Sequence, residues 1–140
     1  MRRLLPAVLS LTVFAASCGS STDQVPSAPT LAPASVVETF TGTLAVMGSN
    51  AHNFITHVPG RLTITLTSVG PSPVSVGIGL GVPSGLSCVL SLGAGTTATV
   101  QAGATPQISG TVLAGTFCVD IFDTGTLTAP VPYSLTVAHP

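Results

Sequence analysis

The sequence predicts an all-β protein: a single antiparallel β-sandwich of the jelly-roll or Greek-key type, behind an N-terminal signal peptide and a Pro/Ser-rich linker. Apolar residues alternate with small polar residues over several short segments, which is the period of a half-buried strand. Turns containing Gly or Pro separate those segments at roughly 8–12 residues, as in sandwiches and barrels. Outside the signal, no window has the period of an amphipathic helix.

The N-terminus combines a basic start, a short apolar run and a cysteine. Two arginines follow Met1, and the apolar run over residues 4–16 is shorter than the ~20 residues that span a bilayer. Its length is typical of a signal peptide. Residues 15–18 read Ala-Ala-Ser-Cys, which is similar to a lipobox with Ala15 where Leu is commonest. The segment 1–17 thus resembles a bacterial lipoprotein signal. The resemblance implies cleavage before Cys18, acylation of Cys18 with palmitate or a related chain, and membrane attachment through that lipid.

Other outcomes for this segment stay open. Ala15 and Ser17 also suit ordinary signal peptidase, which would release a plain secreted protein. The short apolar run argues against an uncleaved membrane anchor. In a bacterium with two membranes, Gly19 in place of Asp implies sorting to the outer membrane. We therefore expect the domain in the periplasm or at the cell surface.

A linker is expected over residues 18–35, where Pro26, Pro29 and Pro33 lie among Ser, Thr and Ala. Pro-rich segments are extended and semi-rigid, and at about 3.1 Å per residue this one reaches at most roughly 50 Å. The sandwich domain is then expected over residues 36–140, which is long enough to bury a core.

Four segments carry the clearest strand pattern. In Arg61–Thr67, aliphatic residues occupy one face and threonines the other, and Val74–Leu80, Phe117–Ile121 and Tyr133–Val137 repeat this period. Weaker candidates, in chain order, are Glu38–Met47, Asn53–Val58, Cys88–Leu92, Thr96–Gln101 and Gln107–Leu113. Turns are expected at Pro59-Gly60, Gly70-Pro71, Gly93-Ala94-Gly95, Ala114-Gly115 and Thr124-Gly125.

The cysteine count supports export. There are three cysteines, and lipidation of Cys18 would leave Cys88 and Cys118 as a pair. In an oxidising compartment such a pair forms a disulfide by default. The alternative is a reactive thiol or a metal ligand, but no basic residue lies near either cysteine in the sequence to lower a thiol pKa.

Charge excludes one class of partner. Charged residues make up 5% of the chain, against roughly 25% in an average protein, and there is no lysine. After cleavage one basic side chain, Arg61, would remain beside four acidic ones, which gives a net charge of −3. Nucleic-acid binding needs several cations on phosphates, so no nucleic-acid partner is expected.

Several motifs then follow in a recognisable order. Gly42-Thr43-Leu44 precedes Pro59-Gly60-Arg61-Leu62, which opens an alternating strand. The chain closes with two further alternating segments, 115–121 and 133–137. This order resembles the bacterial pre-peptidase C-terminal (PPC-like) domains, small extracellular sandwiches of jelly-roll-like topology. The family often has an acidic strand in mid-domain, whereas residues 73–80 here hold no carboxylate. No calcium site is therefore carried over from the resemblance.

Few residues are candidates for chemistry. Asp120 and Asp123 are weak candidates for a metal site, since calcium takes six to eight oxygen ligands, and an Asp capping its own turn is the commoner arrangement. His52 and His57 are five residues apart and would face opposite sides of a strand. His139 is expected at a frayed end, and Glu38 and Arg61 could form a surface pair. The sequence has no Gly-x-Ser-x-Gly motif. We expect no enzyme and no cofactor.

Two non-catalytic functions remain. The domain could be a recognition module for an extracytoplasmic polysaccharide or protein. Its lack of Trp weakens a glycan platform, because such platforms use exposed aromatic residues. Alternatively, it could be a structural envelope spacer or a subunit that associates through open sheet edges, which here lack protective lysines. Of the two, the sequence favours the recognition module.

Overall fold

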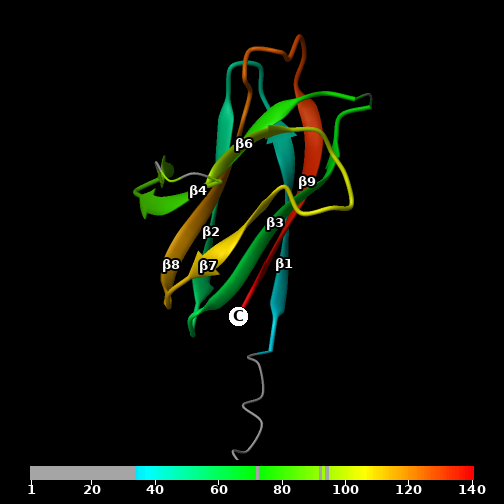
Figure 1. Cartoon of the computed structure of the whole chain (residues 1–140). Coiled ribbons are helices and arrows are strands. Elements are labelled where there is room, and N and C mark those ends of the chain that lie inside the picture. The colour runs from blue at the N-terminus through cyan, green and yellow to red at the C-terminus, as the bar shows by residue number, and fades with distance from the viewer. Residues whose placement is uncertain (1–33, 72, 92, 94) are drawn as a thin grey trace, which may run out of the picture. The chain divides into compact units, whose positions relative to one another are not determined.

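The computed structural model describes residues 34–140, except residues 72, 92 and 94. The predicted signal peptide 1–17, Cys18 and the linker up to residue 33 lie outside the described residues. Within the described range the chain forms nine strands and no helix, which confirms the all-β prediction (Figure 1). In that range, no helix has the length and apolar character needed to cross a membrane.

The strands form two antiparallel sheets that pack as a sandwich. Sheet A has the order β1-β9-β3-β7, and sheet B has the order β2-β8-β4-β5 with β6 also paired to β4. Consecutive strands often change sheet, as in jelly-roll and Greek-key sandwiches. The strand bounds are β1 Val36–Leu44, β2 Ser49–Thr56, β3 Gly60–Val69, β4 Val76–Ser84, β5 Ser87–Leu90, β6 Thr97–Val100, β7 Ile108–Val112, β8 Gly115–Phe122 and β9 Val131–His139.

Each predicted strand segment overlaps one observed strand, and the largest errors, four residues at one end, are at β2 and β4. The segment predicted over Val74–Leu80 stops four residues before β4 ends at Ser84. We predicted a strand over Asn53–Val58, but β2 begins at Ser49. The turn before it includes Met47, which has a φ of 57°. The Asp123 carboxylate accepts a hydrogen bond from the Met47 N–H at 2.9 Å, which holds this turn against the β8–β9 loop. A side chain distant in sequence thus sets where β2 starts.

The core lies between the two sheets. It consists of the apolar residues that alternate along each strand and point inward. In β3 the inward residues are Leu62, Ile64 and Leu66, all fully buried. The facing sheet contributes Val76 and Ile78 from β4. Other core residues are Leu44, Phe54, Val69, Leu80, Ile108, Val112, Val119, Ile121, Leu127, Val131, Tyr133, Leu135 and Val137.

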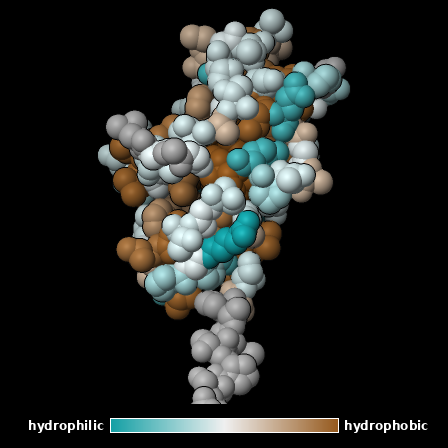
Figure 2. Space-filling view, viewed as in Figure 1, coloured by the Kyte–Doolittle hydropathy of each residue, from teal (hydrophilic) through white to brown (hydrophobic). Residues whose placement is uncertain are grey.

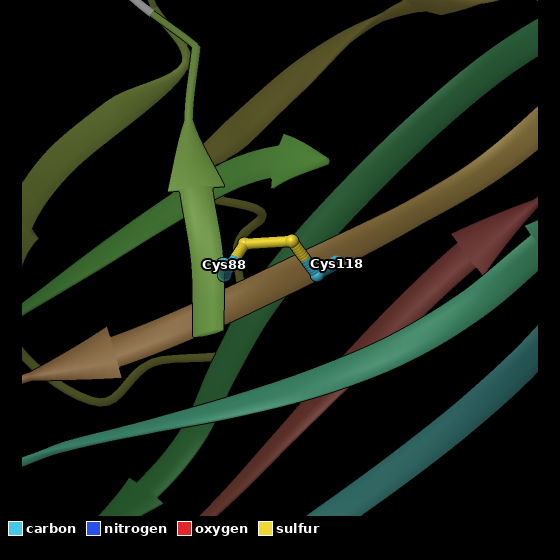
Figure 3. The surroundings of a disulfide bond; sticks show 2 residues. All are labelled: Cys88 and Cys118. Carbon is cyan, nitrogen blue, oxygen red and sulfur yellow. A yellow bond between two sulfur atoms is a disulfide. The ribbon is translucent and has the colours of Figure 1, made fainter. Parts of the chain in front are cut away.

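The β4–β5 hairpin departs from a simple sandwich because it turns over the outer face of sheet B. β5 contacts β8 and β2 as well as its ladder partner β4, and Figure 3 shows it crossing β8. At the crossing, Cys88 of β5 and Cys118 of β8 form the predicted disulfide, with their Cα atoms 5.8 Å apart. Closing a loop of about 30 residues stabilises the fold by roughly 3–4 kcal/mol in the chain-entropy model.

Glycines on β4 make room for this crossing. Gly77, Gly79 and Gly81 have the parity of the outer face, since Ile78 and Leu80 between them point into the core. A Cβ at Gly79 would lie 2.7 Å from Leu90 Cδ2, and one at Gly81 would overlap the backbone carbonyl of Val89. The strand therefore needs residues without side chains where the hairpin lies over it.

We predict that Gly81→Ala is destabilising, whereas Gly110→Ala on β7 is not. In the first variant the new methyl group meets the β5 backbone, which the disulfide holds in place, and overpacking of this kind costs about 1–3 kcal/mol. At Gly110 a Cβ would meet no atom within 4 Å, so that variant should gain roughly 0.5–1 kcal/mol as Gly leaves a strand. Urea unfolding of both variants measures the difference. If Gly81→Ala and Gly110→Ala had equal free energies of unfolding, β5 would not pack closely on β4 at Gly81.

Candidate functional site

The candidate site is a groove between the open edges of the two sheets. β1 is an edge strand of sheet A and β2 is an edge strand of sheet B. The groove between them, which we call the edge groove, has a volume of about 340 Å³. It is lined by Val36, Glu38, Asn53, Phe54, Ile55, His57 and His139. The volume lies at the lower end of the range for small-ligand sites, ~300–1,000 Å³.

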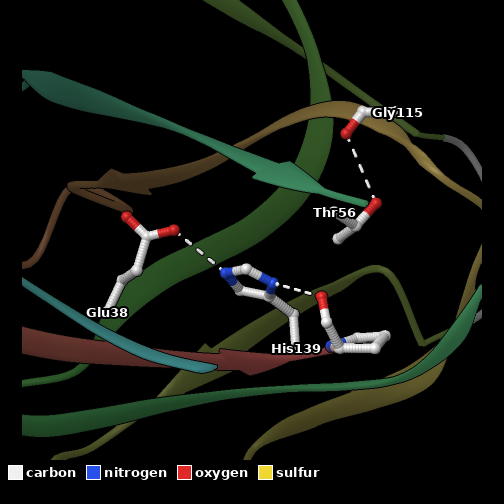
Figure 4. A network of polar contacts seen from close by, with 5 residues as sticks. Glu38, Thr56, Gly115 and His139 are labelled. Atoms are coloured by element: carbon white, nitrogen blue, oxygen red, sulfur yellow. Dashed lines mark hydrogen bonds and ion pairs between the residues drawn. The ribbon is translucent and has the colours of Figure 1, made fainter. Parts of the chain in front are cut away.

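A buried histidine forms part of the groove wall. His139, only 2% exposed, places its Nε2 atom 2.9 Å from Glu38 Oε1 and its Nδ1 atom 3.1 Å from the Pro140 carbonyl oxygen (Figure 4). Its ring also lies 5.3 Å from the Phe54 ring, centroid to centroid. The ring is thus held from several sides, and the Glu38 carboxylate is turned toward the sandwich rather than outward.

Two expectations for these residues were wrong. Glu38 pairs with His139 and not with Arg61, because β9 lies between β1 and β3 in sheet A. His139 is not at a frayed end but is the last residue of β9, paired with Val36 of β1. The sequence carried the signal that we missed: Tyr133, Leu135 and Val137 point inward, and His139 has the same parity.

The other exposed polar groups of the groove come from the end of β2. Asn53 is exposed and lies on the strand, and His57 is exposed just beyond it. His57 lies on the groove while His52 lies near Tyr133, so the two rings are apart as predicted. Beside them, Ile55 is about half exposed. The groove therefore offers polar and apolar contacts to a ligand at the same place.

His52 belongs to an internal cluster instead. Its Nε2 atom lies 2.7 Å from the Tyr133 hydroxyl, and its ring stacks on Phe40 at 4.8 Å. Gly42 allows this packing, because a Cβ there would lie 2.7 Å from the Tyr133 hydroxyl. Burial lowers the pKa of His52 and raises that of Tyr133. Both shifts favour the neutral forms, which suit a hydrogen bond inside the sandwich.

Asp123 caps backbone groups. Its Oδ1 atom accepts hydrogen bonds from the N–H groups of Gly125, Thr126 and Leu127, and its Oδ2 atom accepts one from Met47. These bonds lower the pKa of the carboxyl group, and the bond from the Met47 N–H contributes most to the shift. Both oxygens are therefore directed at N–H donors. Oδ1 caps the turn that follows Asp123, the role expected to be commoner than metal binding.

Asp120 lies on the outer face of sheet B, in register with Ala51 of β2 and Gly79 of β4. It is 9% exposed, and among the residues that the structure describes its Oδ1 atom has no hydrogen-bond partner. Burial raises the pKa of this carboxyl group, and a hydrogen bond from the Ile121 N–H opposes the shift. Among the described residues, no three His, Cys, Asp or Glu side chains gather closely enough to hold a metal ion.

Comparisons with known proteins found no relative of this chain. No protein-family model matches this chain, and no curated protein matches it. The likeness to PPC-like domains therefore stays an expectation drawn from the sequence motifs. The β-sandwich fold is established by the strand pairing within the two sheets.

We predict that Asp120→Asn stabilises the protein near pH 7. Because the pKa of Asp120 is raised on folding, the folded state binds the proton more tightly, and this group lowers stability as pH rises from the unfolded pKa through the folded one. Removing the charge should raise the free energy of unfolding by on the order of 1 kcal/mol. The gain should shrink as pH falls toward the ordinary Asp pKa of about 4. Urea titrations of both proteins at the two pH values test this, and a pH-independent gain would contradict it.

Proposed function

We propose that this chain is an envelope-anchored, non-catalytic lipoprotein whose β-sandwich recognises an extracytoplasmic polysaccharide or protein. The observation that carries the recognition role is the edge groove, where both lining strands are open edges. An extended ligand there can hydrogen-bond to strand backbone, and side-chain contacts on alternate residues then select it. The anchor is proposed from the sequence of residues 1–18.

The chemistry of the groove favours a ligand without net charge. Arg61, the single basic residue of Lys or Arg type beyond the signal, does not line it. The one carboxylate in it, Glu38, is engaged by His139 at 2.9 Å. Asn53 and His57 can donate and accept hydrogen bonds, and the half-exposed Ile55 supplies apolar contact. These features suit neutral sugars or a polar, uncharged peptide.

The polar side chains support a non-catalytic role. Catalysis by a nucleophile needs a base within hydrogen-bond reach and a third group that orients the base. In the described part of the chain, His52 contacts a tyrosine hydroxyl, His139 contacts Glu38, and Asp123 is directed at backbone N–H groups. In these hydrogen bonds neither His52 nor His139 contacts a Ser, Thr or Cys side chain that could act as a nucleophile.

The second candidate is a structural envelope spacer or a self-associating surface subunit. The specific observation in its favour is β1, an edge strand of nine residues with no lysine. Its one charged residue, Glu38, faces His139 and so does not protect the edge against pairing. A plain secreted sandwich protein is the minor alternative, and it follows if Cys18 is not acylated.

We predict that ligand binding depends on the groove. A panel of neutral oligosaccharides and uncharged extended peptides is titrated against the protein, with Asn53→Ala and His57→Ala as test variants. Each variant should weaken binding about two- to tenfold, since a neutral hydrogen bond contributes roughly 0.5–1.5 kcal/mol. Thr111→Ala, an exposed residue on β7, serves as the control and should bind unchanged. Lack of binding by all probes, together with mass that grows with concentration, would favour self-association instead.

We also predict the mass of the native protein. Protein extracted from its native membranes should lack residues 1–17, carry acyl mass on Cys18, and gain two hydrogens when the Cys88–Cys118 disulfide is reduced. Intact mass spectrometry with and without reductant gives all three results. An unacylated soluble species would remove the anchor and leave the plain secreted alternative.

A further inference from the structure

The β4–β5 hairpin exposes three aliphatic side chains within eight residues of the sequence. Val82 and Val89 lie directly opposite each other in the ladder and are 50% and 54% exposed. Leu86, in the turn between them, is fully exposed. Gly85 beside it has a φ of 61°, a conformation that suits glycine in a tight turn. We call these three residues the apolar tip.

The apolar tip is presented in a fixed position. The hairpin turns over sheet B, and the disulfide from Cys88 to Cys118 joins it to β8 close to the turn. In the space-filling view, apolar atoms protrude at the side where the β4–β5 hairpin lies in Figure 1 (Figure 2). Single exposed apolar residues are ordinary, but a group of them on one braced hairpin indicates a contact surface.

We propose that the apolar tip inserts into the uncharged, acyl-chain boundary of the membrane to which the chain is anchored. The inference rests on the proposed lipid anchor and extends it: the domain has a second point of attachment. Lipid attachment and a protein insertion act together in many membrane-bound proteins, since each alone gives weaker or less oriented binding.

Charge supports a lipid partner. No Asp, Glu, Lys or Arg occurs between Arg61 and Asp120, so the β4–β5 hairpin itself can enter an apolar boundary without removing a charge from water. The absence of basic residues also means that anionic lipids are not required. Insertion should therefore occur in neutral bilayers and should not weaken as salt is raised.

The residue types argue against a protein partner at the same place. Protein interfaces are enriched in Tyr, Trp and Arg, which supply most of the binding energy. Residues 82–89 contain none of these, only Val, Pro, Ser, Gly, Leu and Cys. The expected linker, residues 18–35, would reach up to roughly 50 Å when extended.

The test places a fluorescent probe at the tip of the mature chain, residues 18–140. The sequence has no Trp, so L86W gives a single indole at the fully exposed turn position. The chain is attached through the Cys18 thiol to a maleimide lipid in neutral phosphatidylcholine vesicles, with Cys88 and Cys118 left as the disulfide. S109W, at an exposed position on β7 in the other sheet, is the matched control.

We expect the L86W emission to shift to shorter wavelength on the vesicles and to be quenched by lipids brominated on their acyl chains, at low and high salt alike. The S109W emission should stay accessible to an aqueous quencher. Replacing Val82 and Val89 by Thr in the L86W protein should reduce the lipid quenching, and circular dichroism verifies that each variant is folded.

Two outcomes would overturn the proposal. In one, the L86W indole stays open to the aqueous quencher although flotation shows that the protein is on the vesicles. In the other, its emission shifts without any quenching by brominated lipid, which would mean that the tip contacts a second copy of the chain. Because the attachment is chemical, neither result depends on whether cells acylate Cys18, which the mass measurement tests separately.

Discussion

The structure depends on covering strand β8 from both sides. Its inner face packs Val119 and Ile121 into the core between the sheets. Its outer face carries Cys118 and Asp120, both buried although the outer face of a sandwich is usually in water. The β4–β5 hairpin crosses over that face, so β4 must lack side chains at Gly79 and Gly81. The glycine spacing, the disulfide and the burial of Asp120, whose Oδ1 atom has no hydrogen-bond partner among the described residues, all follow from this one crossing.

Polar side chains stabilise the loops of the domain mainly through hydrogen bonds to the backbone and less through ion pairs. Asp123 accepts hydrogen bonds from four N–H groups and joins the turn before β2 to the loop after β8. The Thr56 hydroxyl donates to the Leu113 carbonyl oxygen at 2.7 Å, and Thr96 donates to carbonyl oxygens of its own loop. A disulfide worth roughly 3–4 kcal/mol is a large share of a typical net stability of 5–15 kcal/mol. A chain with 5% charged residues is thus stabilised by means that salt does not screen.

The sequence was sufficient for the strands and for the direction of most side chains, because period two is a local property. Leu62, Ile64 and Leu66 point inward as their alternation predicts, and the pairing of Cys88 with Cys118 follows from counting. It failed where distant segments decide the outcome. The start of β2 at Ser49 depends on a hydrogen bond from Met47 to Asp123, 76 residues away. The edge groove forms because β1 and β2 end up as edges on the same side, which no local pattern encodes. For His139, the inward direction of the side chain could be predicted from the alternation along the strand. Its pairing with Glu38 could not, because it depends on β1 lying beside β9.

A domain with so few charges has no electrostatic means to orient itself at a membrane surface. One basic side chain beyond the signal cannot hold a face toward lipid headgroups, so a lipid tether alone would leave the domain free to rotate. In the proposed arrangement, the apolar tip would supply this contact through the hydrophobic effect, which needs no charge. With the tip at the membrane, the linker and the hairpin together would limit the directions that the edge groove can face. Orientation matters for a recognition role, because a groove turned toward a fixed polysaccharide or protein layer meets its ligand without a rotational search. The proposed lipid anchor would thus account for the exposed leucine and valines of the apolar tip.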